Sequence, residues 1–420
     1  MEKIIVRGGR NLQGEVDISI AKNSVLPIIV ATILNPTEII LKKVPMLEDV
    51  TVLINLLREL NCEVQFSSIT GDLKINTLNL KEVDPNSELI RKMRASFLVM
   101  GPMLARFGRC KISMPGGCNI GSRPVDLHLK GFKSLGIESE IGYGYVEAKV
   151  DKLHGNRIYL DFPSVGATEN IMMAAILAPG ITIIENAAEE PEIWDLARFL
   201  NSMGAKIEGA GYGKITIYGV SQLKQPEPFT PIFDRIEAGT FMVAAGITNS
   251  KITINGVNEE HLMPTIEKLK ECGVYCSIDG QKMIVDGTQE KKPVDIKTMP
   301  YPGFPTDMQA QIMALLSITR GVSVITETVF ENRFMHVGEL GRMGANIKID
   351  GRIAIVEGVS TLTGCEVKAT DLRAGAAMIL AGLVANGETE IGEVYHIDRG
   401  YTNIEEKFKK LGAEIYRLHK

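Results

Sequence analysis

In its last quarter the chain reads Met343-Gly344-Ala345-Asn346-Ile347-Lys348-Ile349-Asp350-Gly351-Arg352-Ile353-Ala354-Ile355-Val356. Apolar and polar residues alternate on both sides of Asp350-Gly351, a dipeptide typical of tight β-turns. The alternation predicts a hairpin of two strands, each with one packed face and one face in water. Helical spacing precedes Met343, so we expect a helix, a turn at Gly344 and then the hairpin.

The helix–turn–strand phrase around Gly344 occurs six times. The middle residues of successive copies are 68 to 75 positions apart. The copies are Leu60-Asn61-Cys62, Leu135-Gly136-Ile137, Met203-Gly204-Ala205, Cys272-Gly273-Val274, Met343-Gly344-Ala345 and Leu411-Gly412-Ala413. Spacing this regular indicates six structural repeats of about 70 residues each.

A second element recurs in step with the first. It is a helix that is apolar on nearly every side, and such a helix must be buried all round. Its copies span residues 24–34, 95–105, 167–178, 238–247, 306–318 and 374–384. A short alternating strand follows, whereas the helix before each turn carries a single apolar stripe and is half exposed. Each repeat is therefore predicted to have the order βαβαββ.

The position of the two chain ends suggests how the repeats are divided. The sixth copy lacks the second strand of its hairpin, and residues 2–9 have the character of that strand. We predict a discontinuous domain of residues 1–21 plus 230–420, closed by the N-terminal strand, and a second domain of residues 22–229. The proline-dense residues 225–228 are a suitable linker. An active site is expected in the cleft between the domains.

The composition is that of a globular protein, with 45% apolar and 23% charged residues. A net charge of −5 argues against nucleic acid as the main partner. The longest apolar run, Val25 to Leu34, is shorter than the roughly 20 residues that span a bilayer. The N-terminus does not resemble a secretion signal, and six cysteines are too few for a disulfide scaffold. We expect a soluble cytoplasmic protein with no membrane partner.

The loop from Pro115 to His128 is the most specific segment. It holds three glycines and two prolines, and Cys118 in it lacks the apolar neighbours of a packed cysteine. Arg123 is expected to lower the pKa of the Cys118 thiol, which makes it a candidate proton donor or nucleophile. The other cysteines lie among apolar residues and are interpreted as packing.

Metal and cofactor sites are not predicted. Cys272 and Cys276 have no second pair of ligands, and the six histidines form no cluster. The sequence contains no Walker A loop and no dinucleotide-binding glycine motif in a βαβ setting.

Charged and polar residues stand at the starts of several apolar helices. They are Lys22, Asn23, Arg94, Asp307, Asp371 and Arg373, and Arg399 lies in a further short motif. Helix N-termini favour anions, so these cations predict an anionic ligand. For a single arginine or lysine, solvated surface charge is the more common explanation. Because such residues recur at the same place in several repeats, we prefer a bound anionic ligand to surface charge as their explanation.

Together the motifs resemble the UDP-N-acetylglucosamine enolpyruvyl transferases of the EPSP synthase superfamily. The matching motifs are Ala21-Lys22-Asn23-Ser24, Met93-Arg94-Ala95-Ser96, Gly116-Gly117-Cys118, Ile120-Gly121-Ser122-Arg123-Pro124, Ser164-Val165-Gly166-Ala167-Thr168, Phe304-Pro305-Thr306-Asp307-Met308-Gln309 and Asp371-Leu372-Arg373-Ala374-Gly375. The resemblance covers the whole chain. It implies an inside-out α/β fold of two domains, each built from three βαβαββ repeats.

The resemblance also implies an activity. The enolpyruvyl group of phosphoenolpyruvate is transferred to the 3′-hydroxyl of UDP-N-acetylglucosamine by addition and elimination, and phosphate leaves. This is the first committed step of peptidoglycan synthesis. Cys118 is implied as the acid at the methylene carbon and Asp307 as the base at the hydroxyl, with Lys22 and Arg399 also catalytic. No cofactor is implied.

Binding roles follow from the same resemblance. Phosphoenolpyruvate is implied to contact Lys22, Arg123 and Arg399, with Arg94 and Arg373 near. Asp371 is also implied as a substrate-binding residue. The nucleotide is implied to contact Arg123, Pro124, Val125, Asp126, Leu127, Ser164, Val165 and Gly166. Asn23 and Val329 match sugar contacts. Simpler explanations exist for Val329, as strand packing, and for Asp307, as a first-turn helix acid.

Two residues depart from the family pattern. Asn119 stands where alanine is frequent, and Leu98 stands where some members carry an aromatic residue. Both are expected to alter loop or sugar contacts without abolishing activity. Cys118 is retained, which predicts alkylation of its thiol by the epoxide inhibitor fosfomycin.

Three other functions are compatible with parts of this pattern. The first is a sibling transferase that acts on shikimate 3-phosphate, although its site has no matching Gly-Gly-Cys loop. The second is a non-catalytic paralogue that binds the UDP-sugar. The third is a six-repeat scaffold without chemistry, which repeats alone permit.

Overall fold

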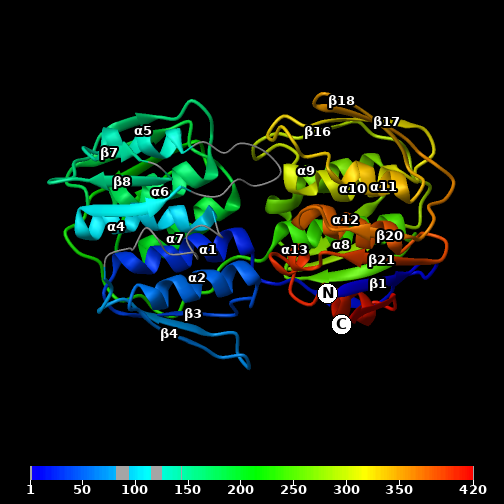
Figure 1. Ribbon diagram of the computed structural model, residues 1–420, viewed down its shortest axis with the longest axis horizontal. Helices are drawn as coiled ribbons and strands as arrows, with labels where there is room; N and C mark the ends of the chain where they lie inside the picture. The colour runs from blue at the N-terminus through cyan, green and yellow to red at the C-terminus, as the bar shows by residue number, and fades with distance from the viewer. Residues whose placement is uncertain (1, 82–93, 115–124, 143, 420) are drawn as a thin grey trace. The chain divides into compact units, whose positions relative to one another are not determined.

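The computed structural model describes residues 2–81, 94–114, 125–142 and 144–419, with the backbone alone at residues 94–96 (Figure 1). These residues form two compact units. Unit 1 comprises residues 2–19 and 233–419, and unit 2 comprises the described residues between 20 and 232. Within the described part of the chain, every helix is too short or too polar to span a bilayer.

The described strands of unit 1 form three four-stranded sheets. Their orders are β20 (Glu366–Lys368), β21 (Glu388–Gly392), β1 (Lys3–Arg7), β22 (Glu414–Leu418); β14 (Tyr275–Asp279), β15 (Lys282–Asp286), β13 (Lys251–Asn255), β2 (Glu15–Asp17); and β16 (Ile296–Lys297), β17 (Val322–Thr326), β19 (Ile353–Glu357), β18 (Asn346–Asp350). In each sheet one pair is parallel and the other pairs are antiparallel. This pattern follows from the predicted βαβαββ order, because a parallel pair needs a helical crossover.

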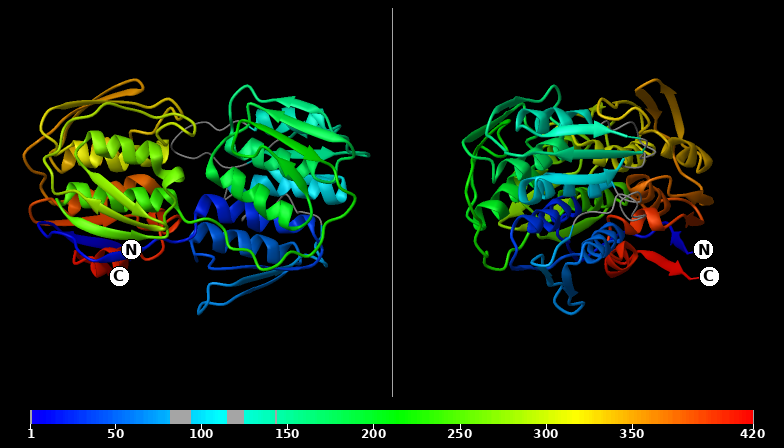
Figure 2. Two further views of the ribbon diagram at one scale, coloured as in Figure 1. Left: turned by 180° about the vertical axis from the view of Figure 1, so that it is seen from behind. Right: turned by 60° about the vertical axis from the view of Figure 1, so that its left-hand side comes forward.

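The helices of unit 1 fall into an inner and an outer set. The inner set is α8 (Arg235–Ile247), η3 with α10 (Thr306–Met308 and Gln309–Leu316) and α12 (Leu372–Gly382). The outer set is α9 (Glu259–Glu271), α11 (His336–Arg342), α13 (Tyr395–Asp398) and α14 (Ile404–Lys410). Every residue of α8 after Arg235 is buried, as the absence of a polar face predicts. The strands lie around the outside of the inner helices (Figures 1 and 2).

Unit 2 has the same plan in its described residues. Its sheets are β11 (Lys206–Glu208), β12 (Lys214–Tyr218), β10 (Ile181–Glu185), β9 (Arg157–Tyr159); β3 (Glu38–Leu41), β5 (Leu73–Asn76), β4 (Glu63–Phe66); and β6 (Arg109–Ser113), β8 (Tyr145–Lys149), β7 (Glu138–Ile141). The inner helices are α1 with η1 (Lys22–Ala31 and Thr32–Leu34), η2 with α4 (Arg94–Val99 and Met100–Phe107) and α6 (Val165–Ala175). The outer helices are α2 (Glu48–Glu59), α5 (Asp126–Ser134) and α7 (Pro191–Ser202).

The six repeated turns share one backbone geometry. The middle residue has a positive φ in every copy: Asn61 (66°), Gly136 (89°), Gly204 (93°), Gly273 (94°), Gly344 (97°) and Gly412 (93°). The next residue then donates its N–H to the carbonyl five residues earlier, as Ala345 does to Leu340 at 3.0 Å. This left-handed C-terminal cap ends a helix and turns the chain, and glycine or asparagine adopts it with little strain. The turn predicted at these six places is confirmed.

The observed strand pairing tests two predictions, the N-terminal strand and the Asp350-Gly351 hairpin. β1 pairs antiparallel with both β21 and β22, so residues 3–7 supply the strand that the sixth repeat lacks. In the hairpin of β18 and β19, Asp350 pairs with Ile353. The two-residue loop is therefore Gly351-Arg352, one position later than predicted, and Gly351 takes the positive φ of 57°.

Candidate active site

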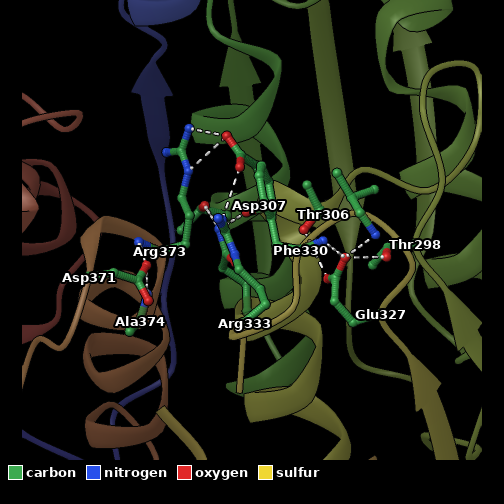
Figure 3. Close-up of polar contacts among 12 residues, drawn as sticks. Thr298, Thr306, Asp307, Glu327, Phe330, Arg333, Asp371, Arg373 and Ala374 are labelled. Atoms are coloured by element: carbon green, nitrogen blue, oxygen red, sulfur yellow. Dashed lines mark hydrogen bonds and ion pairs between the residues drawn. The ribbon is translucent and has the colours of Figure 1, made fainter. Parts of the chain in front are cut away.

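Asp307 lies in unit 1 between two buried arginines (Figure 3). Arg333 Nη2 donates to Oδ1 at 3.0 Å, and Arg373 donates to Oδ2 from Nη2 at 2.9 Å and from Nε at 3.3 Å. The side chains of Arg333 and Arg373 are 4% and 3% exposed, while that of Asp307 is 26% exposed. The arginines thus hold a carboxylate that a ligand can still reach.

The local fold explains why these groups meet. Thr306 and Asp307 open η3, which leads into the inner helix α10, and α10 contacts α12. Asp371 caps α12 by accepting hydrogen bonds from Arg373 N at 2.8 Å and Ala374 N at 3.1 Å. The cap fixes the first turn of α12, which directs the Arg373 side chain to Asp307. Asp371 therefore acts in the structure as a helix cap.

The charge of Arg373 is secured by its surroundings. Burial on its own would lower the pKa of the guanidinium, but Asp307, Tyr401 and Asp234 outweigh it and raise the pKa. The guanidinium also lies over the Tyr401 ring, 5.4 Å from its centroid. Arg373 Nη1 is buried and meets no acceptor among the described residues. The buried guanidinium thus places fixed positive charge beside a reachable carboxylate.

Arg399 follows α13, and the residue before it is fixed by a second arginine. Arg417, on β22, donates to Asp398 from Nη2 at 2.6 Å and from Nη1 at 2.9 Å. The same guanidinium contacts Glu405 at 2.7 Å through Nε. This two-pronged contact holds the C-terminal end of α13, from which the half-buried Arg399 projects.

In unit 2, Lys22 is the first residue of α1 and its ammonium pairs with Asp49. The Nζ–Oδ2 distance is 2.6 Å, and the two side chains are only 11% and 8% exposed. Asn23 beside it is exposed. Ser24 donates to the fully buried Asp195, which also accepts from Ile232 N at 2.9 Å. Lys22 is thus a cation held at a defined place by a buried carboxylate.

The N-terminal turns of α5 and α6 lie side by side in unit 2. Val125 occupies the N-cap position of α5 without a side-chain capping bond, and Asp126 and Leu127 lie in the first turn. Ser164 caps α6 through a 3.4 Å bond from Ala167 N, and a Cβ on Gly166 would come within 3.4 Å of the His128 ring. Asn170 Nδ2 contacts His128 Nδ1 at 3.0 Å and joins the two helices further.

Comparisons with known proteins show which family the chain belongs to. The family model "EPSP synthase (3-phosphoshikimate 1-carboxyvinyltransferase)" matches residues 6–408. UDP-N-acetylglucosamine 1-carboxyvinyltransferase 2 of Clostridium tetani is 65% identical over all of both chains, and UDP-N-acetylglucosamine 1-carboxyvinyltransferase 1 of Clostridium acetobutylicum is 63% identical over the same extent. The chain belongs to the UDP-N-acetylglucosamine 1-carboxyvinyltransferase family. Membership makes it a transferase of peptidoglycan synthesis.

Solved structures show the same fold. The enolpyruvyl transferase NikO from Streptomyces tendae has a TM-score of 0.88 and 23% identity, and it covers 99% of this chain and 98% of its own. An EPSP synthase from Acinetobacter baumannii has a TM-score of 0.73 and 18% identity over all of both chains. The inside-out α/β fold that the resemblance implied is confirmed.

The candidate residues of this family member are brought together in two groups. Asp307, Asp371 and Arg373 meet in unit 1, while Val125, Asp126 and Leu127 in unit 2 lie next to the turn formed by Ser164, Val165 and Gly166. Cys118, Asn119, Arg123 and Pro124 lie outside the described residues, as does the side chain of Arg94. Leu98 is described and is buried.

Sequence reasoning missed three residues that hold the candidate groups: Arg333, Asp49 and Glu327. Arg333 and Asp49 form the ion pairs described above, and Glu327 binds the backbone N–H of Val329 at 2.8 Å. Each is charged and nearly fully buried. Buried charge is rare without a partner, but the sequence does not reveal which charges become buried.

Proposed function

We propose that Asp307 is the base, Cys118 the acid and the clustered cations the anion-binding groups of enolpyruvyl transfer. The reaction moves the 1-carboxyvinyl group of phosphoenolpyruvate to the 3′-hydroxyl of UDP-N-acetylglucosamine. The single observation that carries the proposal is a reachable Asp307 carboxylate held between buried Arg333 and Arg373. A base must be positioned and accessible at once, and this arrangement provides both.

The addition step forms one C–O bond and one C–H bond. The sugar hydroxyl attacks the carbon that carries the phosphate, its proton passes to Asp307, and Cys118 delivers a proton to the methylene carbon. A carboxylate with a pKa of about 4 cannot deprotonate a free alcohol, so the proton moves as the C–O bond forms. Elimination removes a proton from the new methyl group, breaks the bond to the phosphate oxygen and releases phosphate.

The anionic donor needs fixed positive charge. Arg373 is held protonated by its neighbours, and its fixed positive charge favours a carboxylate or phosphate bound nearby. Lys22 supplies a point charge that Asp49 keeps oriented at 2.6 Å. Arg399, Arg123 and Arg94 complete the proposed set. Such preoriented cations stabilise the charge that develops on departing phosphate without reorganisation.

The nucleotide part of UDP-N-acetylglucosamine is proposed to bind to unit 2. Arg123, Pro124 and the first residues of α5, Val125 to Leu127, are proposed to contact it together with the α6 turn of Ser164 to Gly166. Backbone N–H groups at two adjacent helix starts favour a diphosphate. Asn23 and Val329 are proposed sugar contacts, and Asp371 acts near the donor through the α12 cap.

The proposal also covers the division into domains and the location in the cell. Residues 1–21 with 230–420, and residues 22–229, are proposed as functional domains that both supply groups to the reaction, since Asp307 lies in the first and Lys22 in the second. Both substrates are soluble phosphate-bearing metabolites, which supports a cytoplasmic location. No metal or cofactor is proposed, so transfer should proceed undiminished in excess chelator.

The test is inorganic phosphate release from phosphoenolpyruvate with one acceptor at a time. We expect release with UDP-N-acetylglucosamine, none with shikimate 3-phosphate, and loss of release in Cys118→Ser. Release with shikimate 3-phosphate instead would identify the sibling activity. Unchanged release in Cys118→Ser would remove the thiol from the mechanism and favour a different acid.

A further inference from the structure

Glu327 is a buried carboxylate that forms none of the ion pairs found among the described residues. Glu327 directly follows β17 and is 1% exposed. Oε1 accepts hydrogen bonds from Thr298 Oγ1 at 2.8 Å, Val329 N at 2.8 Å and Phe330 N at 3.2 Å. Oε2 accepts from Thr306 Oγ1 at 2.9 Å. Four donors converge on one carboxylate, which is enough to offset its burial.

The four bonds join two separate segments of the chain (Figure 3). One segment contains Thr306, the residue immediately before Asp307. The other runs through Val329 and Phe330 to Arg333, which binds Asp307 at 3.0 Å. Glu327 therefore holds Thr306, which precedes Asp307, and Phe330, which lies three residues before Arg333.

We propose that Glu327 is a positioning residue for enolpyruvyl transfer, acting through Thr306 on the orientation of Asp307. The inference rests on the proposed function of Asp307. The Thr306 hydroxyl is the only side-chain contact of the first turn of η3 with Glu327 among the described residues, and it borders Asp307 directly. Displacing a catalytic group by about 1 Å costs on the order of a hundredfold in rate, so a single tether can matter.

The decisive variant is Thr306→Val, which keeps the side-chain shape and removes the hydroxyl. We expect kcat for phosphate release to fall about tenfold or more, with the KM of each substrate within about threefold, because the substrates still meet the same cations. Thr248→Val is the matched control. Thr248 is also buried in unit 1, at the C-terminal cap of α8, and its hydroxyl bonds to Ala244 O at 2.7 Å. The control should keep wild-type kcat.

Two substitutions of Glu327 distinguish a role of its hydrogen bonds from a role of its negative charge. In Glu327→Gln the amide oxygen can take the place of Oε1, and the amide nitrogen can donate to the Thr306 oxygen, so all four contacts survive. We expect Glu327→Gln to keep kcat within about threefold of wild type and Glu327→Ala to resemble or exceed the defect of Thr306→Val. A Glu327→Gln variant that folds but is as impaired as Glu327→Ala would overturn the positioning role.

Amide hydrogen exchange gives a readout that does not depend on catalysis. Thr306→Val should speed exchange in residues 306–309 and leave residues 236–247 unchanged, whereas Thr248→Val should not affect residues 306–309. Wild-type kcat in Thr306→Val, or unchanged exchange at 306–309, would refute the inference. If the wild type released no phosphate, the proposed function would be refuted instead. The exchange measurement would still test whether the Thr306–Glu327 hydrogen bond orders residues 306–309.

Discussion

Arg373 and Asp307 form an ion pair in which the cation is buried and the anion is accessible. Two nitrogens of the guanidinium approach Oδ2, at 2.9 and 3.3 Å, from a residue 66 positions further along the chain. The arginine side chain is 3% exposed and the carboxylate side chain 26%. The pair fixes the direction of the carboxylate and leaves part of it open to a reacting group.

Replacement of Asp307 by asparagine should remove the base while keeping its size. We expect kcat to fall about a hundredfold to ten-thousandfold, the usual contribution of a positioned base. The variant should also lose stability, since Arg333 and Arg373 would be buried without their anionic partner. The measurements are phosphate release and thermal unfolding. Asp350→Asn, on the exposed hairpin of β18 and β19, is the control, and a kcat within about threefold of wild type in Asp307→Asn would exclude base catalysis by this group.

Asp49→Asn should weaken the binding of phosphoenolpyruvate. The substitution removes the charge that holds the Lys22 ammonium at 2.6 Å, so the cation must be ordered when the substrate binds. We expect the KM for phosphoenolpyruvate to rise about tenfold, with a smaller change for UDP-N-acetylglucosamine. Asp72→Asn is a suitable control, because Asp72 pairs with Lys42 at 2.7 Å in a more exposed setting. A lower KM in Asp49→Asn would mean that Asp49 competes with the substrate for Lys22.

The folded protein should lose stability in mild acid because of His336. Burial lowers the pKa of its imidazole from 6.5 to about 4, with Asp371 and Arg333 acting in opposite directions. The unfolded chain therefore binds more protons than the folded chain between these pH values, so stability is complete above about pH 6.5 and declines toward pH 4. The contribution is about 3 kcal/mol.

The measurement is the free energy of unfolding as a function of pH for wild type and His336→Gln. The wild type should lose more stability than the variant between the two pH values. His154→Gln, at an exposed histidine, should follow the wild-type curve. Parallel curves for wild type and His336→Gln would show that His336 does not titrate in this way.

Fosfomycin should form a single adduct, on Cys118. Burial raises the pKa of Cys62, Cys110 and Cys276 to about 12, and it also raises that of Cys272. These thiols carry almost no thiolate at neutral pH, and the thiolate is the nucleophile. Intact mass and peptide mapping check the prediction. Cys118→Ser should give no adduct and Cys365→Ser should react as wild type, whereas an adduct on any other cysteine would contradict it.

The sequence by itself determined the repeats and the local turns. Glycine or asparagine at Asn61, Gly136 and their four equivalents is a local requirement of a left-handed cap, and helices without a polar face must be buried wherever they lie. Both signals need only neighbouring residues, so the βαβαββ order and the burial of the apolar helices were predictable. The position of Asp307 at the start of a buried helix was visible for the same reason.

Only the tertiary structure decided which charges became buried and with whom they paired. Asp307 meets Arg333 and Arg373 from 26 and 66 residues away, and Glu327 collects donors from Thr298 and Thr306 across two segments. Which charges are buried, and with which partner, depends on how the helices pack. No local sequence pattern shows which residues, far apart in the chain, will meet. Ion pairs and tethers between remote segments therefore had to be read from the folded chain.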